Sequence, residues 1–166
     1  DAQVAKAVSK FPKLLGSSLE LHMKPIAEWL KGLGMDDSQV AKVVVRFPCL
    51  LGGCSLENNL KPKVQCLKKL GLDDMQVAKA IMKFPNVVGN LSLENSMKPK
   101  VQSLRDHGFR DSQIVGALAR FPQLLSYSSK RVEHRINVLK SMGLLTDNAL
   151  CNVLSLTDEK FADRFE

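Results

Sequence analysis

The chain has 166 residues, of which 45% are hydrophobic and 25% are charged, a composition that excludes a wholly disordered protein. No apolar run approaches the roughly 18 residues that a membrane-spanning helix needs, which excludes a membrane span. The 24 Lys and Arg residues outnumber the 17 Asp and Glu residues, and the net charge of +7 favours an acidic partner, with nucleic acid first. The last ten residues carry a net charge of −2, which leaves +9 on the residues before them.

A repeated motif predicts the architecture. The dipeptide Phe-Pro recurs at intervals of 36, 37 and 37 residues, beginning at Phe11, Phe47, Phe84 and Phe121. Such recurrence indicates a solenoid, in which each repeat packs on its neighbours. The chain opens inside a repeat, so we expect a piece of a longer protein. We expect one solenoid domain over residues 1–166, made of a partial repeat (1–17), three repeats (18–54, 55–91 and 92–128) and an atypical capping repeat (129–166).

Each repeat is predicted to begin with a helix. In residues 55–91, the apolar side chains that recur at helical spacing are Leu60, Val64, Leu67 and Leu70. Pro62 is expected in the first turn of this helix, where a missing N–H costs nothing. Gly71 follows the last apolar residue and is expected to end the helix.

A second helix and a short third element are predicted to complete each repeat. Asp73 is a candidate N-cap, and Pro85 ends the second helix because a proline disfavours the helical conformation of the residue before it. The three residues Val87 to Gly89 are too few for a standard helix, so we expect a tight 3₁₀-like turn. We expect Phe84 and the other Phe-Pro phenylalanines in the core. No segment alternates with period two, and the predicted class is all-α.

Catalytic and metal chemistry have little support in the sequence. The four cysteines, Cys49, Cys54, Cys66 and Cys151, form no Cys-x-x-Cys pair, and no histidine lies at zinc-ligand spacing. The acidic pairs such as Asp36-Asp37 precede the second helices, which favours capping over metal binding. We expect no enzyme, no cofactor, no metal and a reducing compartment.

One repeated set of cations precedes Phe-Pro. Lys10, Arg46, Lys83 and Arg120 lie in the last turn of the predicted second helix, and Lys6, Lys42 and Lys79 lie one turn earlier on the same face. A cation at a helix C-terminus is stabilised by the helix dipole, by about 0.3–1 kcal/mol. This set is explained equally well without a partner and with one.

A second set of cations lies at the start of the predicted first helix: Lys24, Lys61, Lys63, Lys98, Lys100 and Arg135. Cations there oppose the helix dipole. Ion pairs such as Glu57–Lys61 offset this unfavourable interaction, but Lys63 and Lys100 have no such pair. In the last repeat Arg131 replaces the glutamate. Cations kept at unfavourable positions suggest an external anion. We therefore predict that the second set, with Arg131, Arg46, Lys83 and Arg120, contacts nucleic-acid phosphates.

Few side chains are suited to reading bases. Aromatic residues make up only 5% of the chain, which favours contact with a duplex backbone over stacking on single-stranded bases. Trp29 and Tyr127 are candidates for stacking, although packing explains each of them better. Arginines could pair with guanine, but the sequence assigns no base to any of them.

The repeat resembles that of the mitochondrial transcription termination factor (mTERF) family. The similarity rests on the block Ser-Leu-Glu-x-x-Leu-Lys-Pro-Lys-Val-x-x-Leu-x-x-Leu-Gly at 55–71, followed by Asp-Asp-x-Gln-Val-Ala-Lys and Phe-Pro. The segment from Leu154 to Phe161 is similar to the family's C-terminal segment. The resemblance implies helix–helix–3₁₀ units in a left-handed superhelix, and an organellar nucleic-acid-binding protein of mitochondria or chloroplasts.

Three functions are compatible with these observations. The first is a monomeric factor that binds duplex DNA along a basic groove and regulates organellar transcription by termination. The second is RNA binding in intron splicing or ribosome biogenesis. The third is a solenoid that takes a helix of an acidic protein partner. A membrane-surface role is disfavoured, because the basic residues lack flanking exposed aromatics.

Overall fold

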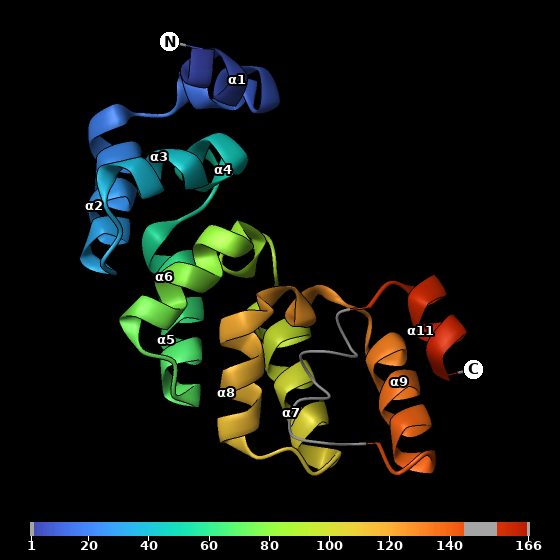
Figure 1. The fold of residues 1–166 in the computed structure, drawn as a ribbon. Helices are drawn as coiled ribbons and strands as arrows, with labels where there is room; N and C mark the ends of the chain where they lie inside the picture. Colours follow the sequence, from blue (N-terminus) through green and yellow to red (C-terminus); the bar gives the residue numbers. More distant parts are fainter. Residues whose placement is uncertain (1, 145–155, 166) are drawn as a thin grey trace. The chain divides into compact units, whose positions relative to one another are not determined.

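The computed structural model describes residues 2–144 and 156–165, with side chains from residue 5 onward. These residues are mainly helical and contain no strand, which confirms the predicted all-α class. The chain divides into two compact units, Asp1–Leu91 and Ser92–Glu166, and this division coincides with a predicted repeat boundary. Figure 1 shows the helices of each unit in chain order.

The first unit contains two complete repeats and the end of another. Its elements are α1 (Ala2–Lys10), η1 (Pro12–Gly16), η2 (Leu19–Met23), α2 (Lys24–Gly32), α3 (Asp37–Arg46), α4 (Cys49–Gly52), η3 (Leu56–Leu60), α5 (Lys61–Leu70), α6 (Asp74–Lys83) and η4 (Pro85–Val87). The second unit contains η5 (Leu93–Met97), α7 (Lys98–Asp106), α8 (Asp111–Arg120), η6 (Pro122–Ser126), α9 (Ser129–Ser141) and α11 (Asp158–Phe165).

The first helix of three repeats is preceded by a turn that the sequence did not predict. Ser55 is the N-cap of this turn, and its Oγ accepts a hydrogen bond from the N–H of Asn58 at 3.2 Å. The chain then makes one π-helical turn, η3, and continues directly into α5, whose first turn holds Pro62 as predicted. A proline crowds the carbonyl four residues before it, and the wider turn just ahead accommodates that crowding. The same turn, as η2 and η5, precedes the Lys-Pro of α2 and α7.

Helix α9 supports this link between the proline and the π-helical turn, because it lacks both. Its N-cap is Ser128. From that cap to Gly143 the chain advances 15 residues, whereas from Ser55 to Gly71 it advances 16. The missing residue is the extra one of the π-helical turn. Arg135 is therefore the counterpart of Lys63 and Lys100, not of Lys61 and Lys98.

Most predicted helix boundaries are confirmed. Asp73 accepts a hydrogen bond from the N–H of Gln76 at 2.7 Å, and the Gln76 side chain accepts one from the N–H of Asp73 at 3.1 Å, which makes a capping box. Asp36 and Gln39 form the same box in the repeat before it. Gly71 ends α5 with a φ of 114°, in the left-handed region. The third elements η1, η4 and η6 are 3₁₀ turns, as predicted, but they begin at the proline, so η4 starts two residues before the predicted Val87. The element α4 is a single α-helical turn.

The phenylalanines of Phe-Pro are not core residues, because all four are only half-buried. In the first unit Phe47 packs against the next repeat at Gly89, where a Cβ atom would stand 2.8 Å from Cζ of the ring and closer still to Cε1. Phe11 lies in the same way against Gly52. The core of this unit consists instead of the aliphatic stripes, with Leu67 and Val77 at 1% exposure or less.

Candidate nucleic-acid interface

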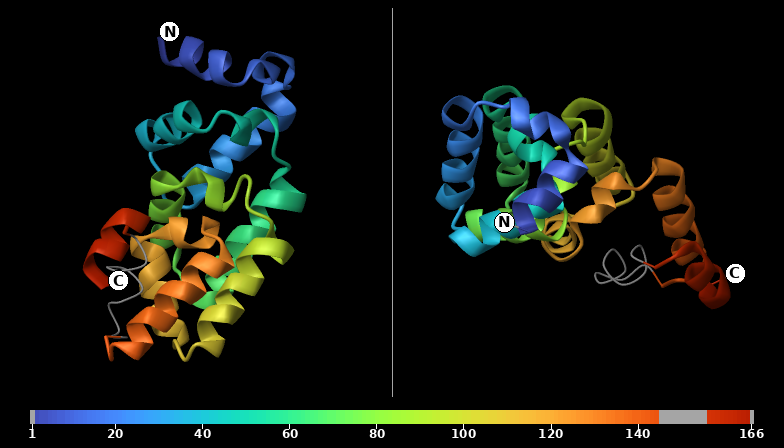
Figure 2. Two further views of the ribbon diagram at one scale, coloured as in Figure 1. Left: turned by 90° about the vertical axis from the view of Figure 1, so that its right-hand side faces the viewer. Right: turned by 90° about the horizontal axis from the view of Figure 1, so that it is seen from above.

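Three second helices of the first unit form a stack whose exposed cations repeat. Helix α1 packs on α3, and α3 packs on α6. The stack is visible in Figure 1 and again in the left view of Figure 2. Lys6, Lys42 and Lys79 lie at the same position of the three helices and are exposed. Within the described residues these three lysines form no ion pair with an acidic side chain.

A second row follows one helical turn later. Lys10 Nζ donates a hydrogen bond to the carbonyl of Val45 at 3.3 Å, and Arg46 Nη1 donates to the carbonyl of Met82 at 3.3 Å. Each cation thus reaches the last turn of the next second helix, where free carbonyls and the helix dipole favour positive charge. Lys83 of α6 and Arg120 of α8 are exposed at the equivalent positions of their helices. We call the six cations of the first unit the stacked row: Lys6, Lys10, Lys42, Arg46, Lys79 and Lys83.

The charge balance differs between the two units. Residues 1–91 hold 13 Lys and Arg and 8 Asp and Glu, a net charge of +5. Residues 92–166 hold 11 and 9, a net charge of +2. In α8 the position equivalent to Lys79 is Gly116. The positive charge is therefore greatest in the unit that carries the stacked row.

Three lysines of the second set are neutralised by glutamates. Lys24, Lys61 and Lys98 form ion pairs with the glutamate one turn earlier, at 2.5, 2.5 and 2.6 Å. These pairs are exposed, so each contributes little to stability. The local compensation predicted from the sequence is thus present. These lysines remain at the surface, but the neighbouring carboxylate offsets their attraction for a phosphate.

The remaining cations of the second set, Lys63, Lys100 and Arg135, are buried, so in this structure they are not accessible to a phosphate as the prediction requires. Their exposed fractions are 6%, 7% and 2%. Lys63 Nζ donates to the carbonyls of Val88 and Gly89, both at 2.8 Å. Lys100 Nζ donates to the carbonyl of Leu125 at 3.1 Å and to that of Tyr127.

Each buried lysine therefore joins the first helix of its repeat to the end of the third element. The negative group that explains these cations is internal, because backbone carbonyls at the end of a turn need donors when they are buried. Burial lowers the pKa of both lysines from the ordinary value, and for Lys63 the nearby Cys54 opposes this shift.

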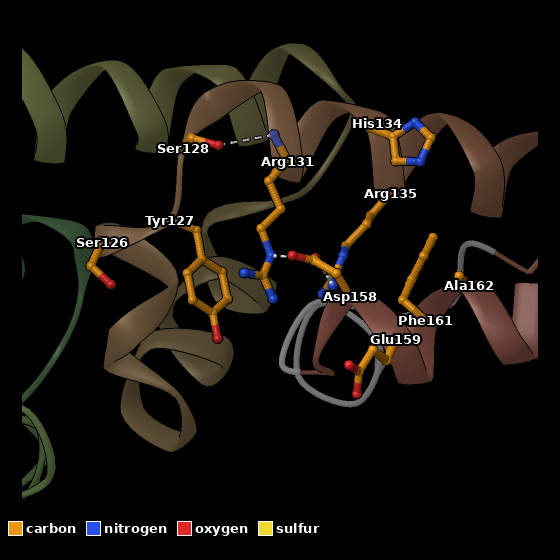
Figure 3. A pocket seen from close by; sticks show the side chains of 10 residues that line it. All are labelled: Ser126, Tyr127, Ser128, Arg131, His134, Arg135, Asp158, Glu159, Phe161 and Ala162. Atoms are coloured by element: carbon orange, nitrogen blue, oxygen red, sulfur yellow. Dashed lines mark hydrogen bonds and ion pairs between the residues drawn. The ribbon is translucent and has the colours of Figure 1, made fainter.

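Arg131 and Arg135 are engaged by the C-terminal helix. Arg135 Nη1 and Arg131 Nη2 donate to the carbonyl of Leu156 at 2.7 and 2.8 Å, and Arg135 Nη2 donates to Oδ1 of Asp158 at 2.6 Å. Burial and the neighbouring Arg131 lower the pKa of Arg135, while Asp158 opposes them. These arginines line a cavity of about 750 Å³ whose other walls include Phe161 (Figure 3). Both arginines, which the sequence left without a local partner, are therefore paired with groups of another segment.

Tyr127 is a packing residue in this arrangement. Its ring centre lies 4.2 Å from the guanidinium carbon of Arg131 and 5.6 Å from the ring centre of Phe121. Trp29 is likewise half-buried. Arg105 forms a bidentate ion pair with Asp111, at 2.7 and 3.1 Å, and this pair lowers the pKa of the aspartate.

The sequence pattern favours the second cation set for phosphate contacts, whereas in the structure the set before Phe-Pro is the better candidate. All its members are exposed, and Lys6, Lys42 and Lys79 have no acidic partner among the described residues. A signal for them was present, because no acidic residue stands three or four positions from any of these three lysines. The burial of Lys63 had no local signal, because its carbonyl partners are 25 and 26 residues away.

The described residues offer no other obvious chemistry. Cys49, Cys54 and Cys66 are free thiols, and Cys151 lies outside the described residues. Residues 2–144 and 156–165 contain no group of three or more metal-ligating side chains. In the same part of the chain no helix has both the length and the apolar character needed to cross a membrane.

Comparison with known proteins identifies one family. The family model described as mTERF matches residues 1–161, which is nearly the whole chain. A search of curated proteins found no match to this sequence.

Proposed function

Because this chain belongs to the mTERF family, we propose that it regulates organellar transcription by binding double-stranded DNA through its stacked row of cations. The family consists of organellar helical-repeat proteins that bind nucleic acid. Duplex DNA as the ligand, termination as the step and mitochondria or chloroplasts as the compartment are parts of this proposal. The bound protein would stand on the duplex as a roadblock to transcription.

One observation carries the proposal: exposed cations recur once per repeat on adjacent helices, and the described carboxylates leave Lys6, Lys42 and Lys79 uncompensated. A nucleic-acid backbone presents negative charges at regular intervals, and a regular row of cations suits it. Phosphate contacts of this kind position a protein without reading bases. The half-buried phenylalanines leave few rings to stack on unpaired bases, which favours a duplex over a single strand.

The test is binding of this chain to a labelled DNA duplex, a DNA single strand and a structured RNA, each across a salt series. If the six cations of the stacked row each neutralise a phosphate, the affinity for the duplex falls about 10³-fold between about 50 and 200 mM salt. A preference for the structured RNA would move the function to splicing or ribosome biogenesis. Binding that does not respond to salt, or no binding above that of an unrelated basic protein, would contradict the proposal and favour a protein partner.

A further inference from the structure

Two arginines of α9 hold the start of α11 through an acidic side chain. Arg131 and Arg135 lie one helical turn apart, and Figure 3 shows both pointing at Asp158. Oδ1 of Asp158 accepts a hydrogen bond from Arg135 Nη2 at 2.6 Å and lies 3.2 Å from Arg131 Nε. A single carboxylate oxygen thus sits between two guanidinium groups, which is the arrangement in which arginines bind a phosphate oxygen.

The carboxylate does not satisfy this pair of arginines. Arg131 Nε is buried and makes no hydrogen bond, although Asp158 lies within ion-pair distance. Asp158 therefore offers this nitrogen charge but no well-aligned hydrogen bond, and buried donors that lack a hydrogen bond are rare in proteins. Aromatic rings hold both guanidinium planes, because Arg131 lies 4.2 Å from the Tyr127 ring centre and Arg135 lies 4.6 Å from that of Phe161. The two guanidinium groups are therefore held in place, and Arg131 Nε is a buried donor among them that lacks a hydrogen bond.

Helix α11 is held by few apolar contacts. Of its eight residues only Phe161 is buried, and the side chain of Asp158 is 75% exposed. The helix carries three acidic and two basic residues, and its net charge of −1 weakly repels a nucleic-acid backbone that approaches α9. An anion with more oxygens than a carboxylate could take the place of Asp158 and also accept from Arg131 Nε.

We propose that Arg131 and Arg135 form an anion site that Asp158 fills in the free protein, and that α11 is a displaceable plug which competes with a nucleic-acid phosphate for this site. This inference rests on the proposed function, because it concerns how nucleic-acid binding is regulated. In the free protein α11 then covers the part of the basic surface that Arg131 and Arg135 form. The apparent affinity is the affinity of the open form multiplied by the fraction of molecules in which α11 is undocked, so a small undocked fraction weakens binding.

Three variants of the full chain test the competition. Asp158→Asn removes the carboxylate charge from the arginines, and Phe161→Ala loosens α11 without changing any charge. Asp163→Asn makes the same charge change as Asp158→Asn on the same helix, at an exposed residue that forms no ion pair among the described residues. We expect the first two variants to raise the affinity for a labelled DNA duplex about fivefold or more above that of Asp163→Asn. Equal affinities for Asp158→Asn and Asp163→Asn, with circular dichroism showing both folded, would overturn the proposal.

Amide hydrogen exchange of residues 158–165 gives a second readout that does not depend on nucleic acid. Inorganic pyrophosphate should speed exchange in α11 of the wild-type chain, and it should do so less in Arg131→Ala, compared with sodium chloride at equal ionic strength. Saturating duplex should have the same effect as pyrophosphate. Opening by pyrophosphate without any duplex binding would refute the proposed function and leave the anion site standing. Duplex binding with α11 equally protected would refute the plug and leave the proposed function standing.

Discussion

Lys63 Nζ donates a hydrogen bond to the backbone carbonyl of Val88 at 2.8 Å, across 25 residues of sequence. Lys100 makes the same contact with Leu125 in the next repeat, and Arg135 takes this position in the last one with Leu156. Each of these repeats is thus held by one buried cation that reaches the end of a following segment. A charged hydrogen bond to a buried carbonyl is stronger than a neutral one, so this contact fixes where that segment sits.

Replacing Lys63 by Met should destabilise the protein strongly. The methionine keeps much of the volume but leaves the carbonyls of Val88 and Gly89 buried without a donor, which costs about 2–4 kcal/mol. Lys61→Met removes the same charge from an exposed ion pair whose lysine is 39% exposed, and it should cost less than about 1 kcal/mol. Urea denaturation of the two variants measures the difference. A cost for Lys63→Met no larger than that for Lys61→Met would show that the buried contact is not stabilising.

Two glycines should respond in opposite ways to alanine. In Gly89→Ala the new Cβ would meet Cζ of Phe47 at 2.8 Å, so Phe47 and the backbone at Gly89 must move apart. We expect this loss of packing to lower the free energy of unfolding by about 1–3 kcal/mol. Gly116 lies in α8 with no atom within 4 Å of the place a methyl group would take, and Gly116→Ala should stabilise by up to about 1 kcal/mol through helix propensity. Thermal denaturation separates the two cases. A neutral Gly89→Ala would contradict the close packing of Phe47.

Cys49 should be an unreactive thiol in the folded protein. Burial, together with the neighbouring Cys54, raises the pKa of Cys49 to about 11. At about pH 8 its thiolate fraction is then about 0.1%, so alkylation should be about 100-fold slower than in the urea-unfolded chain. Mass spectrometry of iodoacetamide-treated protein measures the rate at this residue. Equal rates in the folded and unfolded chains would contradict the raised pKa.

The raised pKa of Cys49 also makes the free energy of unfolding depend on pH. The pKa of Cys49 is higher in the folded than in the unfolded chain, so the folded state favours the protonated thiol. The stabilisation that the protonated Cys49 thiol gives the folded state is fully present below the ordinary pKa of 9.0. It is lost as the pH rises from there towards 11. Replacing Cys49 by Ala should flatten the loss of stability over this range, as followed by urea denaturation at several pH values. An unchanged pH dependence in Cys49→Ala would assign the loss to other groups.

The repeat pattern predicted the helices well because their signals are local. Caps such as Asp73 and glycines such as Gly71 act within one turn, and both lie where the pattern placed them. The π-helical turn before Pro62 was missed because a proline near a helix start is usually accommodated at the first position. The different spacing from Ser128 to Gly143 was the available signal, since one fewer residue accompanies the loss of the proline.

The candidate site was harder to predict because accessibility depends on distant contacts. Whether Lys63 faces a phosphate or a carbonyl is decided by residues 25 positions away, and the helix dipole alone cannot reveal it. Arg131 and Arg135 have no acidic residue three or four positions away on their own helix, but Asp158 supplies the missing charge from another element. Local charge pairing along one helix was therefore a good guide to Lys24, Lys61 and Lys98, and a poor one to the rest.

Binding of nucleic acid by the stacked row is tested most directly by two triple variants with equal net charge. One replaces Lys6, Lys42 and Lys79 by Gln; the other replaces Lys24, Lys61 and Lys98, whose charges are paired with glutamates. The measurement is duplex DNA affinity across a salt series. We expect the first variant to bind more weakly, with a slope of log affinity against log salt that is shallower by about 2–3, and the second to keep the wild-type slope. Equal effects of the two variants would contradict binding by the stacked row, because net charge alone would then explain the affinity.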